Sequence, residues 1–210
     1  YRRVIMKRLI LFLCILVMTG CVRAENSYPT IQDKMMAMES YSTDCKLTYI
    51  SNKGETMYET RQIASRDGRY RIETDKPDEY KNNIIMYDGQ MVWQYNPNLK
   101  ENKISVNPPD KASRREVILF SFLENYVKSK DVGVETANID ESRCTVLEAK
   151  LAGGNELLSS EKLWVDNESQ NPVKLVIYDE ENNERIVAEF SNFVYNYNLK
   201  DEDFKILNSK

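Results

Sequence analysis

The reactive groups of this chain are carboxylates, amines, hydroxyls and four cysteines, because its 210 residues contain no histidine. Without an imidazole there is no Ser-His-Asp triad and no Cys-His pair, and most zinc sites lose a ligand. The acidic run Asp201-Glu202-Asp203 lacks the alternating spacing and the glycine of an EF-hand loop, so it predicts a capped turn before Phe204. We predict no catalytic residue, no metal site and no cofactor.

Cys21 is the cysteine whose surroundings predict a modification. Lys7 and Arg8 precede an apolar segment, Leu9–Met18, which is shorter than the roughly 20 residues that span a bilayer. The ending Met18-Thr19-Gly20-Cys21 resembles a lipobox, where a diacylglycerol is attached to the thiol before cleavage. We therefore predict that residues 1–20 are a lipoprotein signal peptide, with residues 1–5 lying upstream of the natural start, and that Cys21 is the lipid attachment site. An ordinary signal peptide with an incidental cysteine is the alternative.

Two more cysteines belong to the exported part of the chain, since Cys14 lies in the signal segment. Cys45 and Cys144 are about a hundred residues apart and have no Cys-x-x-Cys spacing. An exported protein allows a disulfide between them. Two buried, apolar thiols are the other interpretation, and the sequence leaves both open.

The charge balance excludes one class of partner. The chain carries 29 basic and 33 acidic residues, and removal of residues 1–20 leaves 25 against 33, a net charge of −8. Phosphate backbones favour a basic surface, so no nucleic acid is expected, and docking on anionic lipid by charge is disfavoured as well. The remaining length suits one domain with a real core. We assign residues 21–29 to a lipidated tether and residues 30–210 to this single domain.

Two helices and a series of strands are predicted. The first helix runs from Thr30 to about Ser42, with a threonine cap and an apolar side made by Met35, Met36 and Met38. The second runs from Ser113 to Lys130, because Ser113 and Glu116 form a capping box before an apolar segment. A turn is expected at Gly153-Gly154. The predicted strands are Cys45–Ser51, Glu55–Ala64, Arg69–Glu73, Ile84–Tyr87, Met91–Tyr95, Lys103–Val106, Cys144–Leu151, Ser160–Val165, Val173–Tyr178 and Arg185–Tyr195.

A family resemblance covers most of the domain. The segments that carry it include Gly68–Glu73, Tyr87–Tyr95, Lys162–Asp166, Asn171–Leu175 and Glu189–Phe193. Their order resembles that of LolA/LolB-type lipoprotein carriers. This resemblance implies an α+β fold in which a strongly curved antiparallel sheet, an incomplete β-barrel, holds two main helices on its concave side. Phe120, Phe122 and Leu123 of the second helix would line or fill the hollow, and Trp93 and Tyr95 would belong to the core rather than stack on sugars.

Within that group the chain is most similar to the clostridial spore-germination lipoprotein GerS family, by its lipobox, size, missing histidine and long second helix. That resemblance implies a non-catalytic lipoprotein that is anchored on the outer face of a membrane. In a spore former this places it in the space between the two forespore membranes. It would bind and activate a cell-wall amidase of the CwlD type, which prepares peptidoglycan of the spore cortex for muramic-δ-lactam formation. Tyr195 and Tyr197 are the candidate partner contacts. The sequence does not exclude a homodimer.

Two other functional classes remain beside the partner-binding lipoprotein. One is a lipid or lipoprotein acceptor that holds acyl chains in the hollow, and the other is an enzyme. An empty apolar cavity would favour the acceptor, whereas a filled hollow with an exposed apolar edge would favour partner binding.

Overall fold

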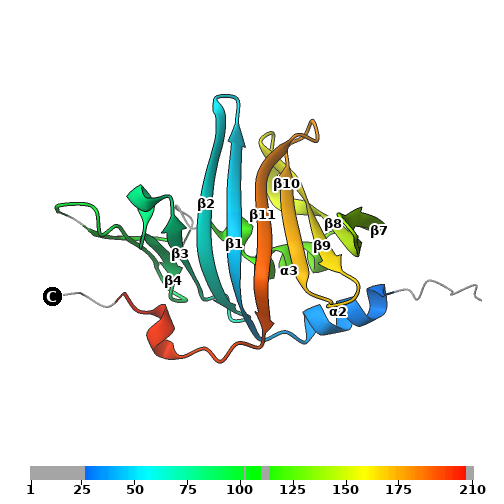
Figure 1. Ribbon diagram of the computed structural model, residues 1–210, viewed down its shortest axis with the longest axis horizontal. Helices are drawn as coiled ribbons and strands as arrows, with labels where there is room; N and C mark the ends of the chain where they lie inside the picture. Colours follow the sequence, from blue (N-terminus) through cyan, green and yellow to red (C-terminus); the bar gives the residue numbers. More distant parts are fainter. Residues whose placement is uncertain (1–26, 102, 110–113, 207–210) are drawn as a thin grey trace, which may run out of the picture.

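The structure, a computed structural model, describes residues 27–101, 103–109 and 114–206. Its described strands form one antiparallel sheet of eleven strands in the order β6-β5-β4-β3-β2-β1-β11-β10-β9-β8-β7 (Figure 1). The strands are β1 (Ser40–Ser51), β2 (Gly54–Ser65), β3 (Tyr70–Lys76), β4 (Ile84–Tyr87), β5 (Val92–Tyr95), β6 (Ile104–Asn107), β7 (Val132–Ile139), β8 (Ser142–Asn155), β9 (Leu158–Asp166), β10 (Pro172–Tyr178) and β11 (Glu184–Tyr195).

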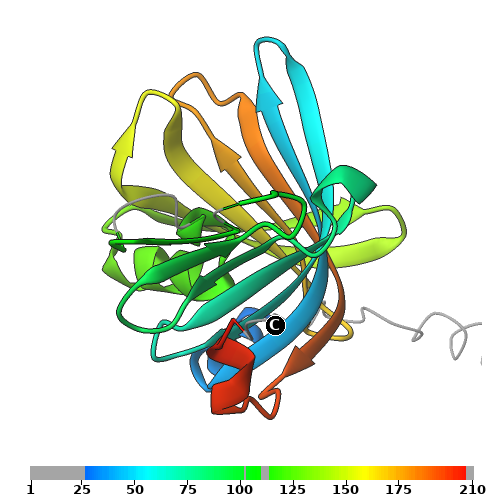
Figure 2. The same cartoon turned by 90° about the vertical axis from the view of Figure 1, so that its left-hand side faces the viewer.

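The sheet is strongly curved and open. β1 lies at its centre, paired with β2 through a short hairpin on one side and with the last strand, β11, on the other. Register shifts in several pairs, such as the one between Ser42 and Asp44 in β1, mark bulges that increase local twist. β6 and β7 end the sheet without pairing to each other, so the barrel stays incomplete (Figure 2). The predicted fold class is confirmed.

The second helix is shorter than predicted. α3 covers Leu119–Lys128, and a separate 3₁₀ turn, η3 (Arg115–Val117), precedes it. Ile118 between them has extended backbone, and Arg114 has a φ of 48°, in the left-handed region. This break lets Val117 and Ile118 both enter the core, where they are 0% and 3% exposed. Glu116 therefore does not occupy the third position of α3, and Ser113, the other half of the predicted capping box, lies outside the described residues.

The first helix also differs from the prediction of Thr30–Ser42. α2 covers Tyr28–Met36, with Pro29 in its first turn, where a missing N–H costs nothing. Residues from Ser40 onward instead belong to β1, because Tyr41 pairs with Ala64 of β2 and with Tyr195 of β11. Sheet pairing on both sides outweighs the helical pattern of the methionines. Within the part of the chain that the structure describes, no helix has the length and apolar character needed to cross a membrane.

Two further corrections concern β7 and β8. β7 was not predicted, although Val132, Val134 and Thr136 alternate with other residues at the period of a strand. The expected turn at Gly153-Gly154 is wrong, because β8 continues through it to Asn155. Gly153, with a φ of 72°, instead contributes to an irregular register between Lys150 and Asn155. Asn155 makes the turn by accepting the N–H groups of Leu157 and Leu158 at 2.9 and 3.1 Å.

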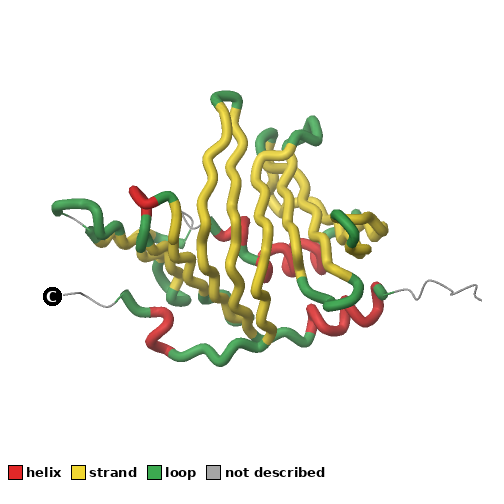
Figure 3. The backbone as a smooth tube through the Cα atoms, in the orientation of Figure 1, coloured by secondary structure: helices red, strands yellow, loops and turns green. Residues whose placement is uncertain are grey.

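The two faces of the sheet carry separate cores. On the concave face, α2, α3 and inward residues of both halves of the sheet form the main core; Figure 3 draws the helices in red against the yellow strands. On the convex face, Ile63, Ile84 and Met86 pack with Phe204 of the C-terminal segment, whose last turn is η4 (Asp201–Phe204). The site described next is built on the concave face, where the sheet curvature creates the space.

Candidate functional site

α3 fills one half of the concave face. Phe120, Phe122 and Leu123 are 8%, 0% and 5% exposed, so they belong to the core. The hydroxyl of Tyr41 accepts the N–H of Leu119 at 3.1 Å, which ties the first turn of α3 to the centre of the sheet. This half of the predicted hollow is therefore filled by the protein's own side chains.

A buried carboxyl lies under the same helix. Glu161 of β9 is 0% exposed and accepts a hydrogen bond from Asn125 Nδ2 of α3 at 2.8 Å. Burial raises the pKa of Glu161 to about 7, against the smaller effect of the Asn125 hydrogen bond. Its Oε2 has no hydrogen-bond partner among the described residues. Sequence reasoning missed this group, since nothing around Lys162-Leu163-Trp164 distinguishes Glu161 from the chain's exposed acids.

A tyrosine–arginine cluster, made of Tyr49, Tyr58, Tyr80 and Arg114, lies in the other half. The Arg114 guanidinium lies 4.6 Å from the centre of the Tyr49 ring and 5.6 Å from that of Tyr58. Tyr58 contacts Tyr49 and Tyr80 edge to face, at centroid distances of 6.2 and 5.7 Å. Burial raises the pKa of Tyr49 to about 12, and the charge of Arg114 opposes that shift.

Two cavities lie on either side of this cluster. We call the first the arginine hollow, of about 590 Å³; it is lined by Leu47, Tyr58, Thr60, Ile72, Thr74, Tyr80, Asn83, Ile84, Ile85, Gln94, Tyr95, Asn96, Leu99, Lys103, Ser105 and Arg114. We call the second the apolar hollow, of about 640 Å³; its lining includes Tyr49, Ile50, Glu116, Asn155, Leu157, Leu158, Arg185 and Ile186. Leu157 is 64% exposed, so the second cavity has an apolar rim open to solvent.

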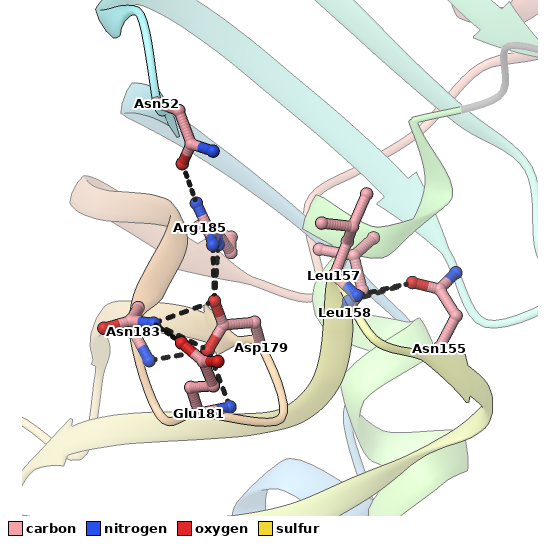
Figure 4. A network of polar contacts seen from close by, with 8 residues as sticks. All are labelled: Asn52, Asn155, Leu157, Leu158, Asp179, Glu181, Asn183 and Arg185. Atoms are coloured by element: carbon pink, nitrogen blue, oxygen red, sulfur yellow. Dashed lines mark hydrogen bonds and ion pairs between the residues drawn. The ribbon is translucent and has the colours of Figure 1, made fainter.

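The rim of the apolar hollow is held by a network at the hairpin tips (Figure 4). Asp179, which is 3% exposed, accepts hydrogen bonds from the Asn183 N–H at 2.8 Å and from Arg185 Nε at 2.7 Å. Burial alone would raise the pKa of Asp179, but the bonds from Asn183 and Arg185 hold it below the ordinary value. Arg185 also donates to Asn52 at 3.4 Å, so the β10–β11 turn contacts the tip of the β1–β2 hairpin.

Little in the described residues suits bond-breaking chemistry. They contain no group of three or more His, Cys, Asp or Glu side chains placed to hold a metal ion. Cys45 in β1 and Cys144 in β8 are both buried, free thiols. Three strands separate them, about 19 Å along the sheet at the usual strand spacing, while a disulfide needs Cα atoms within about 7 Å. The structure thus shows the second of the two interpretations for these cysteines, and the disulfide is not formed.

The remaining candidate residues are distributed over the molecule. Cys21 lies outside the described residues. Tyr195 is half-buried, donates its hydroxyl to Gln170 O at 2.6 Å and has Lys34 over its ring at 4.3 Å. Tyr197 is half-buried on the convex face, beside the second core. Tyr195 packs against the main core beside α2, so the two tyrosines lie on opposite faces of the sheet and do not form one contact surface.

The acidic run and the two outward aromatic residues have structural roles. Asp203 accepts the N–H of Lys200 at 2.8 Å and so caps the turn η4, as predicted. Trp93 donates its Nε1 to Asp88 at 2.6 Å, and both Trp93 and Tyr95 pack against the convex core. Met35 and Met38, which are 1% and 0% exposed, are core residues, as the sequence favoured.

An open, strongly curved antiparallel sheet with helices on its concave face defines a half-barrel domain of the α+β class. The chain belongs to the YdcC-like sporulation protein family, whose model matches residues 2–204. It is 21% identical over 196 residues to sporulation protein YdcC of Bacillus subtilis (strain 168). The matched region covers 91% of the chain and 56% of that protein. The chain thus spans little more than half the length of this relative.

Solved structures share the fold. A conserved protein from Thermus thermophilus matches with a TM-score of 0.56 and 15% identity, over 88% of the chain and 96% of that protein. The GerS lipoprotein, from the structure of the CwlD amidase from Clostridioides difficile in complex with it, matches with a TM-score of 0.49 and 22% identity, over 82% of the chain and 95% of that protein. A LolA superfamily protein from Nitrosomonas europaea matches with a TM-score of 0.47 and 12% identity, over 87% and 99%.

Proposed function

We propose that this sporulation protein is an exported, non-catalytic lipoprotein that binds a cell-wall amidase of the CwlD type and raises its activity during spore cortex modification. The observation that carries the proposal is the filled concave half. α3 fills the space that an acyl-chain carrier of this fold would keep open, with the side chains of Phe120, Phe122 and Leu123. Membership of a sporulation family and the sequence resemblance to the GerS family support a role in spore cortex modification.

The absence of catalysis is part of the same proposal. The chain has no histidine, and its described residues hold no metal-binding cluster. Among the described residues, the carboxyl with the large upward pKa shift is Glu161, which is buried beneath α3 at 0% exposure, where no substrate reaches it. A domain of this kind affects peptidoglycan through another protein.

Two physical effects would let such a domain assist an amidase. A lipid on Cys21 would hold the complex at a membrane and so raise the local concentration of the enzyme. Binding that favours the active conformation of the amidase would shift its population toward that state. The second effect does not require the lipid, so a soluble form of the protein should still activate.

Of the two candidate contacts, Tyr197 is the better one. The hydroxyl and ring of Tyr195 are already used by Gln170 and Lys34 within the chain. The apolar rim around Leu157 offers a further contact surface of the kind that partners cover. A stable complex should bury roughly 1,200–2,000 Å², with a few of these residues at its centre.

The test mixes purified amidase with the chain from residue 22 onward, which cannot be acylated. We expect co-elution in size-exclusion chromatography and faster stem-peptide release, followed by mass spectrometry of cortex fragments. The chain alone should release nothing. Cleavage by the chain alone would contradict the non-catalytic assignment, and separate elution without activation would contradict the partnership.

The apolar hollow supports a second candidate function, that of a lipid or lipoprotein acceptor. Ile50, Leu157, Leu158 and Ile186 line about 640 Å³ beside the filled half, which is large enough to receive part of an acyl chain. Saturable binding of a fluorescent fatty acid, lost in Leu158→Asp and kept in the exposed control Leu99→Asp, would favour this function. No binding would leave the partner function as the better explanation.

A further inference from the structure

Three hairpin tips lie together at one end of the curved sheet. They are the β1–β2 tip, the β8–β9 turn and the β10–β11 turn, drawn at the top of Figure 1. Arg185 joins the β10–β11 turn to Asn52 of the β1–β2 tip, and the Glu180 N–H donates to the Glu156 carbonyl of the β8–β9 turn at 3.2 Å. Because hydrogen bonds connect the three turns, they form one surface, which we call the tip surface.

The apolar hollow belongs to this tip surface. Leu157 in its lining is 64% exposed, and Ile50 and Leu158 are half-buried. Tyr49 and Ile186 complete the apolar walls, and the polar lining consists of residues 51–53, Glu116, Asn155 and Arg185. An exposed leucine beside an apolar cavity of about 640 Å³ is typical of a partner contact, where an apolar anchor enters a pocket.

The turns around the hollow are acidic. They carry five exposed glutamates, Glu55, Glu156, Glu180, Glu181 and Glu184. Within the described part of the chain none of the five forms an ion pair. Arg185 is paired with the buried Asp179 at 2.6 Å, which leaves Lys53 against the five glutamates. A surface with this charge attracts a basic partner and repels an acidic one.

The tip surface and α2 lie at opposite ends of the sheet (Figure 1). α2 begins at Tyr28, seven residues after Cys21. A lipid on Cys21 would keep the α2 end within about 25 Å of the bilayer, since an extended chain spans about 3.3–3.6 Å per residue. β1 has twelve residues and is therefore about 40 Å long. The tip surface of the anchored protein would thus point away from the membrane.

These features distinguish the possible occupants of the hollow. A fatty acid would bring its carboxylate to the five glutamates, and it would have to come from a bilayer at the other end of the molecule. A second copy of the chain would bring five more glutamates into the same contact. A different protein, with an apolar protrusion surrounded by lysines and arginines, fits both the hollow and the charge around it.

We propose that the tip surface is where this protein binds its amidase, and that the amidase contributes an apolar protrusion surrounded by basic residues. The inference rests on the proposed function and adds the surface and the chemistry of the contact. Leu157 and the walls of the apolar hollow bind the protrusion, and the glutamates pair with the basic residues around it. The lipid anchor and the amidase contact then lie at opposite ends of the domain.

The experiment titrates purified CwlD-type amidase, in a calorimeter, into the chain from residue 22 onward, which retains the whole described domain. We expect Leu157→Asp to weaken binding at least tenfold and the double variant Glu180→Lys/Glu181→Lys to weaken it several-fold. Val127→Asp is the matched control and should bind like the parent, because Val127 is also 64% exposed but lies on α3, outside the hollow. High salt should weaken binding of the parent more than that of the double variant.

Parental affinity in both Leu157→Asp and the double variant would overturn the tip surface as the contact and leave the amidase partnership standing. No binding by the parent would instead overturn the proposed function, and this inference with it. Two other results would give the hollow a different occupant and so overturn the inference. One is saturable fatty-acid binding that Leu157→Asp abolishes while amidase affinity is unchanged, and the other is a dimer of the chain alone that Leu157→Asp disrupts. The substituted side chains are exposed, so all variants should melt like the parent.

Discussion

At the scale of single residues, burial decides which acids and thiols have unusual properties. Glu161 and the exposed Glu156 belong to neighbouring stretches of sequence, yet only Glu161 lies under α3 with one amide partner. The same holds for Cys45, whose pKa burial raises to about 12, so that the thiol is a poor nucleophile as well as unbridged. Exposure, not residue type, separates structural from reactive groups here.

Glu161 predicts a pH dependence of stability. Its pKa in the folded protein, about 7, lies above the unfolded value of 4.5, so folding favours the protonated form. The stability contribution of this group is therefore full below about pH 4.5 and is lost as the pH rises through 7, by at most roughly 3 kcal/mol. Glu161→Gln should remove this decline and melt at a higher temperature than the parent at pH 8.

Thermal melts of both proteins between pH 5 and 8 check this expectation. Glu156→Gln is the matched control, since it removes one exposed carboxyl and should leave the pH profile as it is. Parallel profiles for the parent and Glu161→Gln would show that the carboxyl does not titrate in this range.

At the scale of elements, α3 packs on the concave face of the curved sheet and fills part of the half-barrel. Its inward side chains meet β8 and the centre of the sheet, and Tyr41 fixes its first turn through the Leu119 N–H. The 3₁₀ turn before it positions Val117 and Ile118 in the same core. This element thus determines both the stability of the domain and the space left for ligands.

Phe122→Ala tests this role of α3. Truncating a phenylalanine that is 0% exposed should cost roughly 3–5 kcal/mol, through lost burial and the cavity left behind. Val127→Ala, on the same helix but 64% exposed, should change the free energy of unfolding by less than about 1 kcal/mol. Urea unfolding of the two variants measures the difference, and similar midpoints would mean that α3 is not packed on the sheet.

At the scale of the whole molecule, the open sheet leaves the protein with two unlike halves. α2 and α3 fill the main core, while two hollows remain on either side of the tyrosine–arginine cluster: one toward β3–β6, the other between the β1–β2 tip and the ends of β8, β9 and β11. The C-terminal segment covers the convex face and not the hollows. The tip surface around the apolar hollow therefore stays available to a partner.

The proposed membrane anchoring rests on Cys21, which gives the last prediction. Cys21→Ala should abolish incorporation of an alkyne-labelled fatty acid and prevent cleavage before residue 21 in the producing cell. Cys14→Ala, within the same leader segment, should be labelled like the parent. Labelling detected by gel fluorescence in Cys21→Ala, at the level of the parent, would contradict lipidation at this position.

Most strands can be predicted from the sequence, because the alternation of apolar and polar residues and turn signals such as Asp88-Gly89 are local features. Gly89 has a φ of 99°, and Asp88 accepts the N–H groups of Gln90 and Met91, as the dipeptide predicts. The bounds predicted for β4 match those of the structure. The lack of histidine, the acidic balance and the family resemblance were equally visible without a structure.

The bounds of several elements and the surroundings of their side chains depend on tertiary contacts. Ser40–Ser42 belong to β1 and not to the predicted helix, because two neighbouring strands pair with β1. The break at Arg114–Ile118, the sealed Glu161 and the hollow around Arg114 arise from residues far apart in the chain that meet in the curved sheet. Local sequence records the conformational preference of a segment, whereas burial, pKa and cavity shape depend on which distant side chains exclude water.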